Sequence, residues 1–105
     1  MKEVSVQQLK QMKDAGEKFQ LIDVREPWEI EICSIEGESI PMGELLTRIG
    51  EIKEDIPVII HCRSGGRSAN VVNALEMQRG MTNLHNLTGG ILAWADEIDQ
   101  TMEKY

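Results

Sequence analysis

Residues 57–68 read Pro57-Val58-Ile59-Ile60-His61-Cys62-Arg63-Ser64-Gly65-Gly66-Arg67-Ser68, and the remaining segments are expected to support this one. A short apolar run ends at Cys62, two glycines and two arginines follow, and a helical pattern then begins. An apolar run of this length, bounded by glycine, is typical of a strand buried on both faces of a parallel sheet. We therefore predict a strand, a tight loop and a helix, with Cys62 at the point where the strand becomes the loop.

The loop residues favour an anion-binding cradle around the sulfur of Cys62. Gly65 and Gly66 tolerate positive φ, so backbone N–H groups can point into one concavity, and a helix start adds free amides and the positive end of its dipole. With Arg63 and Arg67 nearby, Cys62 is predicted to have a lowered pKa and to act as a nucleophile near neutral pH. The alternative is that Cys62 is a small hydrophobic residue closing a core strand, where most free cysteines lie.

This loop resembles the active-site loop of the rhodanese (thiosulfate sulfurtransferase) family, where a cysteine at a strand end carries a persulfide inside a six-residue loop. Two more stretches resemble signatures of that family and stand in the family's order. They read Asp23-Val24-Arg25-Glu26-Pro27-Trp28-Glu29 and Leu87-Thr88-Gly89-Gly90-Ile91-Leu92-Ala93-Trp94. The chain departs from the family at Cys33-Ser34-Ile35-Glu36-Gly37, where Gly-His-Ile-x-Gly is usual. The resemblance otherwise covers nearly the whole chain.

The resemblance implies one rhodanese-like α/β domain over residues 1–105, with three layers: a central five-stranded, mostly parallel sheet and helices on both faces. The residues themselves support parallel strands, because strand and helix patterns alternate along the chain. Strands are expected at 19–24, 39–41, 57–61 and 83–87, and helices at 4–15, from Pro27 onward, at 43–49, after the loop up to Gly80, and from Gly89-Gly90 onward. Glu29 favours the positive end of the helix that starts at Pro27, and Leu45, Leu46 and Ile49 are expected on the buried face of the helix over 43–49. In the first helix, Ser5 and Gln8 have capping-box spacing. Trp28 and Trp94 are expected in the core, and residues 100–105 are expected to fray.

For function, the resemblance implies a sulfurtransferase that moves a sulfane sulfur from a donor such as thiosulfate to a thiol or cyanide, without metal or cofactor. Cys62 is the expected nucleophile and persulfide carrier. The amides of residues 63–67 are expected to stabilise the persulfide anion, and Arg63 and Arg67 to attract a small anionic donor. The full set of expected active-site loop residues is Arg63, Ser64, Gly65, Gly66 and Arg67. Asp23 is expected to accept loop N–H groups or to pair with an arginine, and Arg25 to add positive field.

Two other classes of function remain open on the sequence. A cysteine phosphatase shares the strand, the His-Cys pair and the amide cradle, but its pattern is Cys-x5-Arg. Here Arg67 follows Cys62 after four residues, Ser68 stands at the position that the phosphatase pattern needs, and the loop holds no carboxylate to act as general acid. A non-catalytic rhodanese-like binding module would keep the fold with an inert Cys62.

Composition narrows the partners and the compartment. A formal net charge of −7 argues against nucleic acid, whose binding requires positive charge to neutralise phosphate. The apolar runs are too short to span a membrane, no secretory segment follows Met1, and two cysteines make no disulfide framework, so a cytoplasmic protein is expected. The expected acceptor is a small thiol or a thioredoxin-like protein. Cys33 most simply fills core volume, and its alternative role is a resolving thiol.

The two histidines are not expected to serve the cysteine. His61 precedes Cys62 in a strand, so its side chain points to the opposite face of the sheet and makes a poor base for the thiol. His85 is expected on an ordinary strand surface. Cysteine and histidine lack the close paired spacing of a zinc site, so no metal is expected.

Overall fold

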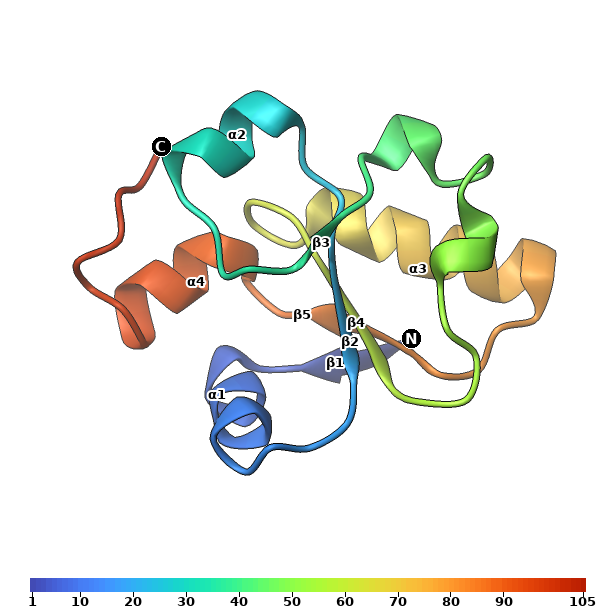
Figure 1. The fold of residues 1–105 in the computed structure, drawn as a ribbon, viewed down its shortest axis with the longest axis horizontal. Helices are drawn as coiled ribbons and strands as arrows, with labels where there is room; N and C mark the ends of the chain where they lie inside the picture. Colours follow the sequence, from blue (N-terminus) through green and yellow to red (C-terminus); the bar gives the residue numbers. More distant parts are fainter.

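The computed structural model describes all of residues 1–105 and has one five-stranded sheet in the order β1-β5-β4-β2-β3 (Figure 1). The strands are β1 (Lys2–Val4), β2 (Gln20–Asp23), β3 (Glu38–Ser39), β4 (Val58–His61) and β5 (Leu84–Leu87). Every neighbouring pair is parallel, so the prediction of five strands is confirmed and the sheet is parallel throughout. Only four of them are recognisable in the sequence, because β1 is three residues long and two of these are exposed.

Helices cover both faces of the sheet, as the α/β prediction requires. On one face, α1 (Val6–Asp14) packs beside α4 (Gly90–Glu97), and on the other lies α3 (Gly66–Arg79) (Figure 1). The short α2 (Pro27–Ile32) follows β2. Two 3-10 helices, η1 (Met42–Glu44) and η2 (Ile49–Glu51), precede β4. No helix combines the length and the apolar character needed to cross a membrane.

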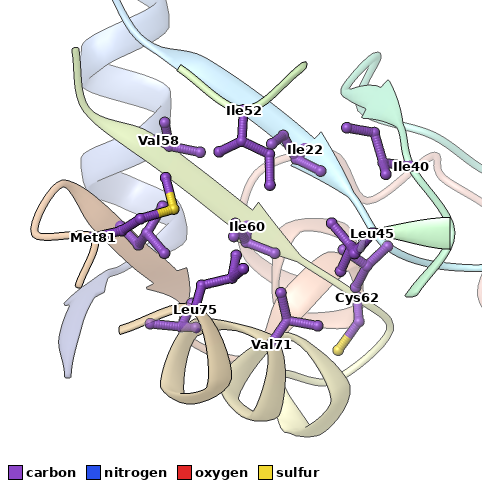
Figure 2. Close-up of a cluster of buried hydrophobic side chains, with 13 residues drawn as sticks. Ile22, Ile40, Leu45, Ile52, Val58, Ile60, Cys62, Val71, Leu75 and Met81 are labelled. Atoms are coloured by element: carbon purple, nitrogen blue, oxygen red, sulfur yellow. The ribbon is translucent and has the colours of Figure 1, made fainter. Parts of the chain in front are cut away.

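Each face of the sheet has its own hydrophobic core, because successive side chains of a strand point to opposite faces. Ile59 belongs to the core under α1 and α4, whereas Ile60 belongs to the core under α3. All four residues of β4 are fully buried, which explains the continuous apolar run that preceded Cys62 in the sequence. Figure 2 shows the core under α3, with Cys62 at its edge where β4 has ended.

The helix ends follow local rules. Ser5 caps α1: its hydroxyl accepts the amide of Gln8, and the Gln8 side chain accepts the amide of Ser5, so the predicted capping box is confirmed. Gly80 ends α3 with φ of 64°, as predicted. These features were predictable because each depends on residues within one turn of the helix.

The helix predicted over residues 43–49 is wrong. That segment holds η1 and turns instead, and Leu46, assigned to the buried face, is 63% exposed. Glycine at positions 43 and 50 and β-branched Thr47 disfavour a helix, and so short a segment needs a complete apolar face packed on the protein to form one.

Trp28 and the last residues of the chain also differ from expectation. Trp28 is 60% exposed, because α2 is only six residues long and the one side chain it buries is that of Glu29; Trp94 is buried as predicted. Residues 100–105, called the tail below, do not fray. The side chains of Met102 and Tyr105 pack against the core under α1 and α4.

Candidate active site

The loop after β4 directs backbone amides at the sulfur of Cys62. Gly65 donates its N–H to Sγ at 3.1 Å, and Ser68, in the first turn of α3, donates its N–H at 3.5 Å. Gly65 has φ of 108°, a conformation that other residues rarely adopt, and it caps the start of α3. The turn is therefore shaped so that an amide of the loop and one of the helix meet at the thiol.

A hydroxyl completes the surroundings of the sulfur. Ser68 Oγ lies 3.4 Å from Cys62 Sγ and 2.5 Å from Asn86 Oδ1. Ser68 and Asn86 are both buried. One hydroxyl proton can serve the sulfur or the amide oxygen, so the bond can pass to the sulfur when it becomes anionic. Sequence reasoning missed both residues as site components. Ser68 could have been found from its place one residue after the loop, whereas Asn86 reaches the site only through the pairing of β5 with β4.

Opposing effects act on the ionisation of Cys62. Burial raises the pKa of the thiol, since the side chain is almost completely covered. Hydrogen bonds from the Ser68 hydroxyl and from the amides of Ser68, Gly65 and Ser64 lower the pKa and outweigh burial, so the net pKa lies below its usual value. The buried sulfur is thus surrounded by donors, and the thiolate is the form they favour.

Two residues of the expected active-site loop, Ser64 and Gly66, lie at the surface of the protein. Gly66 begins α3. The amides of Gly66 and Arg67 make no hydrogen bond to Sγ, so the donors in the structure are a subset of those expected, together with Ser68.

Arg67 is held by a carboxylate that sequence reasoning did not place in the site. Its Nη1 and Nη2 donate to the two carboxylate oxygens of Glu29 at 2.8 and 2.7 Å. Glu29 is buried on α2, and chiefly the bond from Arg67 lowers its pKa to about 2. In the sequence, Glu29 had only a role at the helix N-terminus, because nothing local shows that Arg67 lies opposite.

Asp23 and Arg25 form a fully buried ion pair at the end of β2. The Arg25 Nη2 donates to Asp23 Oδ2 at 2.8 Å, and its Nε donates to Oδ1 at 3.0 Å. Of the two roles expected for Asp23, the structure places it in the arginine pair. Arg25 also donates to the carbonyl oxygen of Cys33 at 2.8 Å. The guanidinium of Arg25 is therefore occupied by contacts inside the protein and does not face solvent.

Arg63 points to the tail. Its Nε donates to the main-chain oxygen of Tyr105 at 2.7 Å, Nη2 contacts the same oxygen, and the guanidinium lies 5.0 Å from the centre of the Tyr105 ring. Tyr105 is thus a neighbour of the loop, 42 positions away in sequence. Sequence reasoning missed it, since a single tyrosine outside any motif gives no signal.

The start of α4 supports the loop from behind. The amides of Ile91 and Leu92 donate to the carbonyl oxygens of Cys62 and Arg63, each at 3.0 Å. Gly90 has φ of 59°, and a Cβ there would lie 2.6 Å from the Arg63 carbonyl oxygen. Helix and loop can approach this closely only because the residue between them has no side chain.

His61 faces away from the thiol, as predicted. Its Nδ1 lies 3.3 Å from the Cys62 carbonyl oxygen, and its Nε2 lies 3.5 Å from Asp23 Oδ2 without a hydrogen bond. Burial lowers its pKa, so the imidazole is neutral. No group of three His, Cys, Asp or Glu side chains lies close enough together to bind a metal ion. The two cysteines belong to different sides of the sheet: Cys62 lies in the core under α3, and Cys33 packs against the core under α1 and α4.

Comparison with known proteins agrees with this geometry. The family model of the rhodanese-like domain matches residues 5–97. A protein named sulfurtransferase from Allochromatium vinosum is 39% identical over 94 residues, covering 89% of this chain and 87% of that protein. The probable adenylyltransferase/sulfurtransferase MoeZ of Mycobacterium tuberculosis is 30% identical over 105 residues; the match covers 97% of this chain but only 26% of MoeZ.

A solved structure shows the same fold over the full length. The crystal structure of a rhodanese-like domain protein from Staphylococcus aureus aligns with a TM-score of 0.82 at 28% identity, covering 100% of this chain and 99% of that one. The family model spans most of the chain, and the fold agrees along its whole length. The chain therefore belongs to the rhodanese-like domain family.

Proposed function

We propose that this protein transfers sulfane sulfur through a persulfide on Cys62. The observation that carries the proposal is the convergence of the Gly65 and Ser68 amides on Sγ, at 3.1 and 3.5 Å. Donors arranged around a sulfur favour an anion there and would equally favour the outer sulfur of a persulfide. Sulfurtransferase-named relatives of similar length support the same chemistry.

The proposed reaction has two displacements. The Cys62 thiolate attacks the outer sulfur of thiosulfate, the sulfur–sulfur bond of the donor breaks, and sulfite leaves with the bonding pair. An acceptor thiolate or cyanide then attacks the outer sulfur of the Cys62 persulfide, and the Cys62 thiolate leaves. Charge and sulfur balance in both steps, and neither requires a metal or a redox partner.

The structure brings one carboxylate to the loop, which bears on the phosphatase alternative. A phosphatase needs a protonated acid for the leaving oxygen. Glu29 is the carboxylate beside Arg67, and its pKa of about 2 leaves it without a proton near neutral pH. Glu29 therefore fits the role of a holder of Arg67 better than that of a general acid.

Intact mass spectrometry tests the proposal. Wild-type protein incubated with excess thiosulfate, then freed of it, is expected to gain one sulfur atom, and the gain should disappear on adding cyanide. Cys62→Ser should gain nothing, whereas Cys33→Ser should gain the same sulfur as wild type. Sulfur on Cys62→Ser, or none on wild type with thiosulfate or an organic persulfide, would contradict the proposal.

The rate of alkylation of Cys62 distinguishes a sulfurtransferase from a non-catalytic binding module. A thiol with a lowered pKa reacts with iodoacetamide at neutral pH faster than an ordinary cysteine. An unreactive Cys62 that also takes no sulfur would identify a non-catalytic module, and hydrolysis of an aryl phosphate by wild type but not by Cys62→Ser would identify a phosphatase.

A further inference from the structure

The tail lies against the active-site loop at Tyr105. It leaves α4 and runs to the end of α2, as Figure 1 shows in red. There the main-chain oxygen of Tyr105 accepts the Arg63 guanidinium, with Nε at 2.7 Å, and the Tyr105 ring lies beneath that guanidinium. A guanidinium that is both hydrogen-bonded and stacked must give up these contacts before it can bind an incoming anion.

The hydroxyl of Tyr105 reaches the other two arginines. It accepts the Arg25 Nη1–H at 3.0 Å and donates to Glu29 Oε1 at 2.9 Å, the same oxygen that binds Arg67 Nη2. Tyr105 therefore contacts Arg63 and Arg25 directly and Arg67 through Glu29. One residue of the tail is thus linked to all three arginines of the site, two of them by direct contact.

Each of these cations already has a partner. Asp23 neutralises Arg25, and Glu29 neutralises Arg67. Arg63 is not paired with the carboxylate of any side chain, and its guanidinium donates its hydrogen bonds to Tyr105 alone. Of the three, Arg63 is thus the arginine whose availability depends on the tail, in a protein whose net charge of −7 already repels anions.

We propose that Tyr105 determines the charge class of the sulfur donor by withholding Arg63 from it. With the tail docked, the loop discriminates against a dianion such as thiosulfate and favours a weakly charged sulfane donor, such as an organic persulfide. The donor preference rests on the proposed function. The effect of the tail on charged reagents does not, because it can be measured on the alkylation of Cys62 without any sulfur transfer.

Two alkylating agents of nearly equal size and unlike charge test this effect. Iodoacetate is an anion and iodoacetamide is neutral, and both react with the Cys62 thiolate by displacing iodide. The rates are measured on the Cys62 peptide by mass spectrometry, and the quantity compared is the ratio of the iodoacetate rate to the iodoacetamide rate. Tyr105→Ala keeps the main-chain oxygen but removes the ring beside Arg63 and the hydroxyl bonds to Arg25 and Glu29 that hold the tail in place. It is therefore expected to raise this ratio about fivefold, the effect of one charge at contact distance in water.

Three further variants identify the cause. Tyr105→Phe keeps the ring but loses the hydroxyl bonds to Arg25 and Glu29, and is expected to raise the ratio by a smaller factor. Adding Tyr105→Ala to Arg63→Gln should leave the ratio of Arg63→Gln unchanged. The control, Thr101→Ala, removes a tail contact with Asp99 that involves no arginine, and its ratio should equal that of wild type.

A second measurement links the effect to sulfur transfer: the KM for thiosulfate should fall in Tyr105→Ala while the KM for an organic persulfide changes little. An alkylation ratio that is the same in wild type and Tyr105→Ala overturns the inference, even if the wild type takes up sulfur. A ratio that rises while wild type takes no sulfur from either donor supports the role of the tail in charge selection and overturns the proposed function.

Discussion

At the scale of single residues, the site depends on how a buried anion is held. The Cys62 sulfur is covered by protein, which disfavours charge, yet its hydrogen bonds with Ser68 and Gly65 lower its pKa overall. Glu29 shows the same principle with an ion pair: it is 3% exposed and still ionises more readily than a carboxylate in water. In both cases, donors aimed at the anion outweigh the loss of water.

Glu29→Gln tests the ion pair through its pH dependence. The folded-state pKa of about 2 lies below the unbound value of 4.5, so the stabilisation is complete above about pH 4.5 and is lost as the pH falls toward 2. The side chain of Arg67 is 35% exposed, and solvent screening limits the contribution to about 1–2 kcal/mol. At pH 7, Glu29→Gln should be less stable than wild type by this amount.

Urea unfolding of both proteins at several pH values between 2 and 7 measures this difference. It should shrink steadily below pH 4.5. Glu44→Gln is the control, because Glu44 is exposed and pairs with Arg48 outside the site. A stability difference for Glu29→Gln that stays constant down to pH 2 would show that the carboxylate is not held by charge.

At the scale of elements, the loop depends on the close approach of α4. The first amides of that helix donate to carbonyl oxygens of Cys62 and Arg63, and Gly90 leaves room for them. The glycine pair Gly89-Gly90, which suggested a family signature, therefore has a steric role. It lets the start of α4 come close enough to support the loop that follows β4.

Gly90→Ala should destabilise the fold and disturb the loop. Alanine at φ of 59° is strained, and its Cβ would also lie 2.6 Å from the Arg63 carbonyl oxygen, so the helix or the loop must move. Gly16→Ala is a matched control: Gly16 has φ of 66° but nothing within 4 Å of its Cβ position. We expect about 1 kcal/mol of destabilisation at Gly16 and at least about twice that at Gly90.

Thermal unfolding gives the stability of the two variants, and iodoacetamide gives the reactivity of Cys62 in each. Only Gly90→Ala should slow the alkylation of Cys62, since only this position touches the loop. Equal loss of stability at both glycines, with Cys62 reactivity unchanged, would show that the close approach of α4 does not shape the site.

At the scale of the whole molecule, Arg25 joins segments that are distant in sequence. It pairs with Asp23 at the end of β2, donates to the carbonyl oxygen of Cys33 after α2, and donates to the Tyr105 hydroxyl of the tail. The side chain is completely buried, so each of these contacts is made in a medium where an unpaired charge is costly.

Arg25→Met should therefore destabilise the protein by about 3–5 kcal/mol, because it leaves the Asp23 carboxylate buried without a partner. The double variant Asp23→Leu with Arg25→Met removes both charges and should recover a large part of that loss. Urea midpoints of wild type, single and double variants measure both effects. A double variant that is less stable than Arg25→Met would show that the pair acts through something other than its charges.

Local patterns predicted the parts of this fold that are themselves local. The capping box of Ser5 and Gln8 lies within one helical turn, and the strand before Cys62 was visible as an apolar run. Where a pattern was read without its tertiary surroundings it misled: Leu46 and Trp28 look like core residues, but both are more than half exposed.

By itself, the sequence determined the strand, loop and helix around Cys62 and the family, because these are written in contiguous motifs. Only the tertiary structure decided which charges meet. It paired Arg67 with Glu29 and placed Tyr105 against Arg63, contacts between residues 38 and 42 positions apart. The physical reason is that an ion pair depends on distance in space, and folding brings together side chains whose separation along the chain carries no signal of their contact.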